Sequence, residues 1–162
     1  MSSIKEYAPR LGPGYSRVPA GQPASSSIGR SHYLAYAKYD FSVDGGAVAT
    51  ITPKQNSTIP NNAIITQVVI NIITTLTGTT GNVSFGLSAG STAGVAAFLA
   101  ATARASLATD TVWQGVPVQQ ATGAQTSYIK MTADGTITMT ISTNALTAGK
   151  CEVFVDYLLP NE

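Results

Sequence analysis

The sequence predicts an all-β domain with one short helix, arranged as an antiparallel β-sandwich or jelly-roll-like barrel that follows an extended N-terminal arm. Three observations support this fold class. Apolar and polar residues alternate with a period of two in several segments after residue 31, as in strands with one buried face. Turn residues separate these segments at short intervals, which is typical of sandwiches and barrels. Threonine is frequent along them, and its β-branched side chain suits strand surfaces.

The first 31 residues differ in composition from the rest of the 162-residue chain. They are rich in proline, glycine and serine and lack the periodic apolar residues that could offset the entropy cost of ordering. We therefore divide the chain into an extended arm, residues 1–31, and a β-sandwich domain, residues 32–162. The arm is either a tail without a partner or a segment that orders on a partner surface. Its candidate anchoring side chains are Tyr7, Arg10, Leu11, Tyr15, Arg17 and Val18.

The strand pattern begins at His32 and continues to Val43 with clean alternation. Asp44, Gly45 and Gly46 follow, a combination that is typical of hairpin turns. Residues 47–52 are therefore expected to form the return strand.

The most hydrophobic segment, residues 64–75, has apolar side chains on both faces of the expected strand. Such a strand is buried on both sides, so one face could belong to the core and the other to a subunit contact. The candidates for that contact are Ile65, Val69, Ile73 and Trp113. Trp113 is otherwise a core residue or part of a sugar-binding surface.

A helix is expected between Val95 and Leu107, because apolar residues recur there at helical spacing. Ser91 or Thr92 could cap its start. Further strands are expected over residues 82–87, 113–118, 127–131, 135–142 and 150–159. Within 135–142, Ile137, Met139 and Ile141 should point inward and Thr136, Thr138 and Thr140 outward.

Charged residues make up 10% of the chain, against about 25% in ordinary soluble domains. Between residues 55 and 129 the only ones are Arg104 and Asp110. So neutral a surface favours a protein that packs against its own copies or a larger assembly, although a coat of polar uncharged residues is the alternative. The net charge of +1 argues against nucleic-acid binding, and no apolar run reaches membrane-spanning length.

Candidate catalytic and metal-binding groups are few. His32 is the single histidine, and Cys151, the single cysteine, is expected to be a reduced thiol in a strand. Glu152 and Asp156 should share a strand face, where solvent exposure or an interface ion pair is favoured over a glycosidase pair. We expect no enzymatic activity, no cofactor and no metal.

Four stretches carry a resemblance to a known family: residues 39–48, 59–65, 99–118 and 146–157. They are turn and strand patterns rather than a chemical signature. From about Tyr33 to Leu159 the chain resembles small head proteins of tailed bacteriophages, in particular capsid decoration (cement) proteins.

The resemblance implies a β-sandwich that binds the outer face of an icosahedral shell as a homotrimer and bridges neighbouring major capsid protein subunits. It also implies a place on the capsid surface of the virion after synthesis in the host cytoplasm. The arm lies outside the resemblance, and its use as a strap across capsid subunits is inferred from composition. A tail, fibre or receptor-binding module and a carbohydrate-binding jelly roll remain as alternatives.

Overall fold

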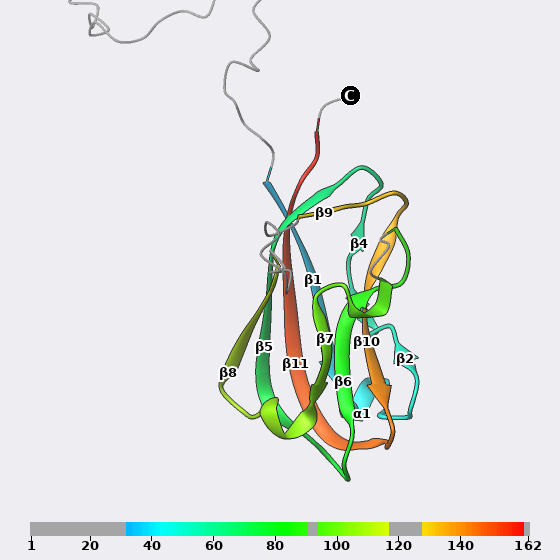
Figure 1. The fold of residues 1–162 in the computed structure, drawn as a ribbon, viewed down its shortest axis with the longest axis vertical. Coiled ribbons are helices and arrows are strands. Elements are labelled where there is room, and N and C mark those ends of the chain that lie inside the picture. The colour runs from blue at the N-terminus through cyan, green and yellow to red at the C-terminus, as the bar shows by residue number, and fades with distance from the viewer. Residues whose placement is uncertain (1–31, 91–93, 117–127, 161–162) are drawn as a thin grey trace, which may run out of the picture.

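The computed structural model describes residues 32–90, 94–116 and 128–160. These residues form two antiparallel sheets that pack face to face, which confirms the predicted β-sandwich (Figure 1). The larger sheet has the order β3 (Gln55–Asn56), β1 (His32–Asp40), β11 (Leu146–Leu158), β5 (Ile64–Gly78), β8 (Thr111–Val116), and β9 (Ile129–Lys130) also pairs with β5. The smaller sheet has the order β2 (Thr50–Ile51), β10 (Gly135–Ser142), β6 (Asn82–Leu87), β7 (Leu99–Ala103), and β4 (Thr58–Ile59) also pairs with β10.

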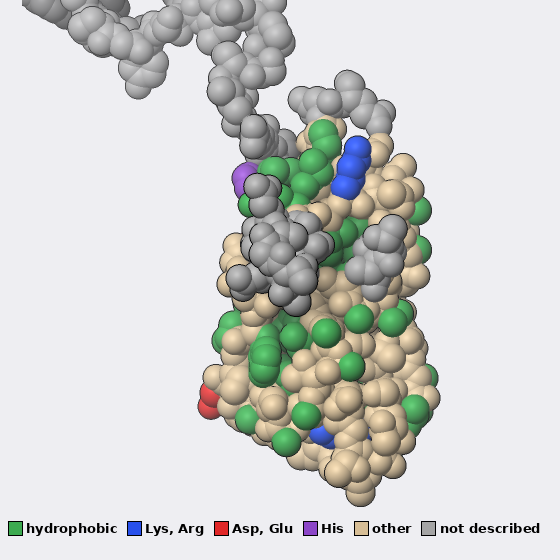
Figure 2. All heavy atoms as spheres, viewed as in Figure 1, with side chains coloured by type: hydrophobic (Ala, Val, Ile, Leu, Met, Phe, Trp, Pro, Cys, Tyr) green, Lys and Arg blue, Asp and Glu red, His purple; other side chains and the backbone are tan. Residues whose placement is uncertain are grey.

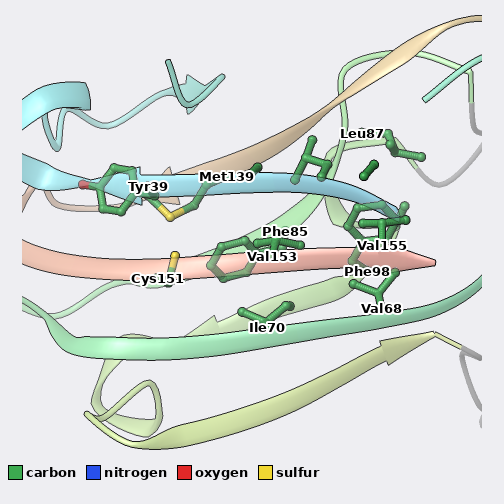
Figure 3. Packing of buried hydrophobic residues seen from close by; sticks show 14 of the residues in the cluster. Tyr39, Val68, Ile70, Phe85, Leu87, Phe98, Met139, Cys151, Val153 and Val155 are labelled. Atoms are coloured by element: carbon green, nitrogen blue, oxygen red, sulfur yellow. The ribbon is translucent and has the colours of Figure 1, made fainter. Parts of the chain in front are cut away.

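The core lies between the sheets and is built from the alternate residues that point inward. β11 contributes Cys151, Val153 and Val155, and these face Phe85 of β6 and Met139 of β10 (Figure 3). All five side chains are at most 3% exposed. Cys151 is a free, fully buried thiol in a strand, as predicted. Burial raises the pKa of this thiol, so it stays uncharged.

Strand β5 contains an irregularity that the alternation pattern did not anticipate. Its register with β11 shifts between Asp156 and Tyr157, opposite Gln67 and Ile65. The extra residue, Thr66, reverses the inward and outward positions, so both Ile65 and Val68 are fully buried. The prediction that Ile65 shares a face with Val69 and Ile73 is therefore wrong.

The first strand ends earlier than predicted, at Asp40, and is followed by the short helix α1 (Phe41–Asp44). The Asp40 carboxylate accepts a hydrogen bond from Ser42 N and caps this helix. The expected hairpin does not form. β2 pairs with β10 of the smaller sheet instead of β1, because the chain crosses between the sheets after Gly45, which has a left-handed φ of 77°.

The predicted helix between Val95 and Leu107 is also wrong. This stretch contains the 3₁₀ turn η2 (Gly94–Ala96), strand β7 and the 3₁₀ turn η3 (Arg104–Ser106). β7 supplies hydrogen-bond partners to the otherwise open edge of β6, with Val83 opposite Thr102. Satisfying a sheet edge outweighs the modest helix preference of alanine.

Turn η2 lies over the outer side of the smaller sheet. Ser84 Oγ donates a hydrogen bond to the Val95 carbonyl, and a Cβ at Gly86 would overlap the backbone of Gly94 and Val95. Thr138, opposite Gly86, is therefore 1% exposed rather than solvent-facing as predicted. The predicted bounds of β10, Gly135–Ser142, and its predicted inward residues Ile137, Met139 and Ile141 are confirmed. No helix among the described residues is long and apolar enough to cross a membrane.

Candidate interaction surface

The side of the larger sheet that points away from the core is a broad surface to which four strands contribute. We call it the outer face. Its side chains come from the positions that alternate with the buried ones. It consists of Leu34, Tyr36, Lys38 and Asp40 of β1, Lys150, Glu152, Phe154 and Asp156 of β11, Val69, Asn71 and Ile73 of β5, and Val112 and Gln114 of β8.

An apolar row crosses the middle of the outer face. Tyr36 pairs with Phe154 and Phe154 pairs with Val69, so three neighbouring strands place these side chains in register. The rings of Tyr36 and Phe154 have centroids 5.3 Å apart and are tilted by 48°. Two more apolar side chains flank the row, Leu34 with 59% and Val112 with 65% of its surface exposed. Together they form an apolar strip that nothing among the described residues covers.

Polar groups beside the apolar row are held in defined positions. Tyr36 Oη donates a hydrogen bond of 2.8 Å to Glu152 Oε1, and Lys38 lies opposite Glu152 in the register. Burial of the ring, and next the hydrogen bond to Glu152, raise the pKa of Tyr36 to about 12. The hydroxyl therefore remains a donor across the physiological pH range and orients the carboxylate.

The two carboxylates of β11 are too far apart for glycosidase chemistry. Glu152 and Asp156 share the outer face, as predicted, but four residues of strand separate them by about 13 Å. Glycosidase pairs lie about 5–9.5 Å apart. Among residues 32–90, 94–116 and 128–160, no group of three His, Cys, Asp or Glu side chains is placed to hold a metal ion.

An ion pair lies at one end of the outer face. Lys150 Nζ lies 2.7 Å from Asp40 Oδ2, and the two residues are opposite each other in the register of β1 and β11. The hydrogen bond from Lys150, followed by that from Ser42, lowers the pKa of Asp40 to about 2.

Replacing Lys150 by Met should raise the pKa of Asp40 from about 2 toward its ordinary value of 3.8. Because the folded-state pKa is lowered, the pair stabilises the fold above pH 3.8 and loses its effect as the pH falls toward 2. NMR titration of the Asp40 carboxyl carbon measures the change. Lys38→Met, on the same strand face, is the matched control, and an equal shift in both variants would contradict the assignment.

The sequence-predicted contact residues are distributed over three environments. Val69 and Ile73 lie on the outer face, and Ile73 is 37% exposed. Ile65 is in the core. Trp113 is half-buried opposite Ile70 on the inward side of β8, and its indole N–H has no hydrogen-bond partner among the described residues. His32 is exposed at the start of β1.

The arm candidates Tyr7, Arg10, Leu11, Tyr15, Arg17 and Val18 lie outside the described residues. In contrast, sequence reasoning missed the contribution of Leu34, Tyr36 and Phe154 to the surface. The available signal was the presence of apolar and aromatic residues at outward positions of two alternating strands. Figure 2, which shows one side of the molecule, has few charged side chains among the polar and apolar ones.

Comparison of the sequence with family models and with curated proteins finds no match. Among solved structures, a chain in the acidic stable capsid structure of Helicobacter pylori bacteriophage KHP30 is similar. It is 18% identical, the alignment covers 80% of this chain and 89% of that chain, and the TM-score is 0.50. Chains of the cyanophage Pam1 capsid asymmetric unit and of the capsid of Ralstonia phage GP4 are 16% and 14% identical. Their alignments each cover 80% of this chain and 86% of theirs, with TM-scores of 0.44 and 0.49. At such identities the first likeness shows a shared fold.

Proposed function

We propose that this protein is a structural component of a phage capsid, where it decorates the outer surface and bridges neighbouring major capsid protein subunits. The observation that carries the proposal is the fold that it shares, over 80% of its length, with a chain in the KHP30 capsid structure. The phage-head resemblance of residues 33–159 points in the same direction. The proposal includes a place in the virion and a non-enzymatic role.

The outer face supplies a contact surface of the required kind. Protein interfaces combine an apolar centre with a polar rim. Tyr36, Phe154 and Val69 provide an apolar centre, while Lys38 and Asp156 lie on either side of it along the strands. Each contact can be weak, because several contacts per oligomer and many copies per shell multiply the total effect.

We further propose a homotrimer in which each arm straps a neighbouring capsid subunit. Thirty-one extended residues can span about 100 Å, which is enough to cross a subunit. The basic Arg10 and Arg17 would pair with acidic groups on the shell, and Tyr7, Leu11, Tyr15 and Val18 would fill apolar pockets. Prolines in the arm narrow its free ensemble and so lower the cost of ordering.

Removing residues 1–30 should leave the domain folded but weaken its binding to shells. The truncated protein, which starts at Ser31, should retain the far-UV circular dichroism of the full chain, because the two sheets are built from later residues. Added salt should weaken the full chain only partly, because salt screens exposed charge pairs but not apolar contacts. Occupancy on undecorated shells of the parent phage, measured by co-sedimentation, tests both statements.

Two outcomes decide between the parts of the proposal. If the truncated protein binds as tightly as the full chain, the strap is wrong while the decoration role stands. If neither protein binds shells, and particles carry only a few copies at the tail, the decoration role is wrong and the chain is a tail or fibre part. Cryo-electron microscopy of intact particles gives the copy number, the symmetry axis and the oligomeric state.

A further inference from the structure

Arg104 is a buried cation at the end of the sandwich where the β5–β6 and β10–β11 turns meet. This is the lower end in Figure 1, away from the C-terminus. Only 5% of the residue is exposed. Its Nη1 donates a 3.0 Å hydrogen bond to the Ala145 carbonyl, and Nη2 donates to the Asn144 carbonyl. The guanidinium therefore ties the β10–β11 turn to η3.

The β5–β6 turn is shaped around the same guanidinium. A Cβ at Gly78 would overlap Nη1, and a Cβ at Gly81 would overlap Nη2. Because glycine has no side chain, Gly78 and Gly81 allow the β5–β6 turn to pack directly over the Arg104 guanidinium. This packing gives Arg104 a structural role, but it provides hydrogen-bond partners only for the two Nη atoms.

The charge of Arg104 and its third nitrogen have no partner among the described residues. Nε is itself buried and has no hydrogen-bond acceptor there, and the one ion pair among the described residues joins Asp40 and Lys150. Burying a cation without an opposite charge is costly. Between residues 55 and 129, Asp110 is the only other charged residue. A neutral hydrogen-bonding side chain could connect the two turns without the free-energy cost of burying a charge.

A cavity of about 550 Å³ adjoins the guanidinium, a size that is typical of small-ligand sites. Its lining combines Leu76, Ala103, Ala105 and the two turn glycines with Thr75, Thr77, Thr79, Thr80 and Asn82, and Arg104 is the only charged residue in it. The hydroxyls of Thr75 and Thr77 already bond to Thr109 and Thr147. Those of Thr79 and Thr80, at the tip of the turn, remain as donors for a ligand.

We infer that this cavity binds a carboxylate group, paired with Arg104 and held by the hydroxyls of Thr79 and Thr80. A single positive charge in a cavity that is otherwise lined by apolar and uncharged polar residues matches a singly charged anion, and the planar guanidinium matches a planar carboxylate. The carboxylate can come from an acidic side chain of a partner protein or from a small organic acid. The inference is independent of the proposed capsid role, because the isolated protein is enough to test it.

The test is an NMR titration of the ¹⁵N-labelled full chain with N-acetylglutamate amide. The Nε–Hε signal of Arg104, identified by its absence from Arg104→Lys, and the amides of Thr79 and Thr80 should shift and approach saturation as the compound is added. N-acetylglutamine amide, which lacks the charge, should leave them in place. Equal shifts with both compounds, or with neither, overturn the inference.

Other anions identify the source of the group. A response to acetate as strong as that to N-acetylglutamate amide supports a small organic acid, and a weaker response supports a protein side chain. A response to inorganic phosphate without one to either carboxylate overturns the assignment.

A second pair of variants retains Arg104 and so avoids a folding defect. Ala105 is exposed and lines the same cavity. Ala105→Glu should supply the carboxylate from within the chain, raise Tm above that of Ala105→Gln and abolish the response to N-acetylglutamate amide. Ala105→Gln should retain a response. Identical Tm values and identical titrations for the two variants would contradict a carboxylate site.

Discussion

Replacing Ile70 by Ala is expected to lower the free energy of unfolding by about 2–4 kcal/mol. Ile70 is fully buried in the middle of β5, where Val153 and Trp113 lie opposite it on the two neighbouring strands. The substitution removes buried methyl and methylene groups and leaves a cavity that the two packed sheets cannot close. Urea unfolding followed by circular dichroism measures the loss as a lower midpoint with an unchanged slope.

Ile73→Ala is the matched control, because it makes the same chemical change three residues along the same strand. Ile73 is 37% exposed on the outer face, so it loses less apolar burial and leaves no closed cavity. Its expected loss is less than about half that of Ile70→Ala. Equal losses would show that the inward and outward positions of β5 are assigned incorrectly.

The parts of the fold that depend on local pattern were predictable from the sequence. β10 occupies Gly135–Ser142, the range expected from the alternation of apolar residues with threonine. β6 occupies Asn82–Leu87, which is also the expected range. Each of these elements shows its period and its boundaries in its own residues, so no knowledge of the partner strand is required.

The errors occur where distant parts of the chain decide the structure. The bulge at Thr66 changes which β5 residues are buried, and it is defined by the register with β11. β7 replaces a predicted helix because it pairs with β6. Thr138 is buried because η2 packs against Gly86, which lies opposite it in the smaller sheet. In each case a long-range contact outweighs a local preference, which single-residue patterns cannot reveal.

The candidate surface was predictable only in part for the same reason. Val69 and Ile73 were singled out because their own strand is apolar on both faces. Tyr36 and Phe154 sit in strands that look half-polar, and they join Val69 only through the pairing of β1 and β5 with β11. The partner of that surface is not encoded in any local motif.

Replacing Val112 by Asp is expected to weaken binding to undecorated shells at least about tenfold, if the outer face is the contact surface. Central apolar contacts often contribute about 2 kcal/mol or more, and a buried unpaired carboxylate adds a desolvation cost. Leu34→Asp, at the opposite side of the apolar strip, should have a similar effect. Both side chains are more than half exposed in the isolated protein. Neither substitution should therefore change the free energy of unfolding by much.

Val48→Asp is the matched control for this experiment. Val48 is 52% exposed, the chemical change is identical to that at Val112, and the residue precedes β2 of the smaller sheet rather than lying on the outer face. Co-sedimentation over a range of protein concentrations gives the affinity of each variant for shells. Unchanged binding of Val48→Asp together with weakened binding of Val112→Asp and Leu34→Asp supports contact through the larger sheet. The opposite result would place the contact near Val48 and leave the outer face turned toward solvent.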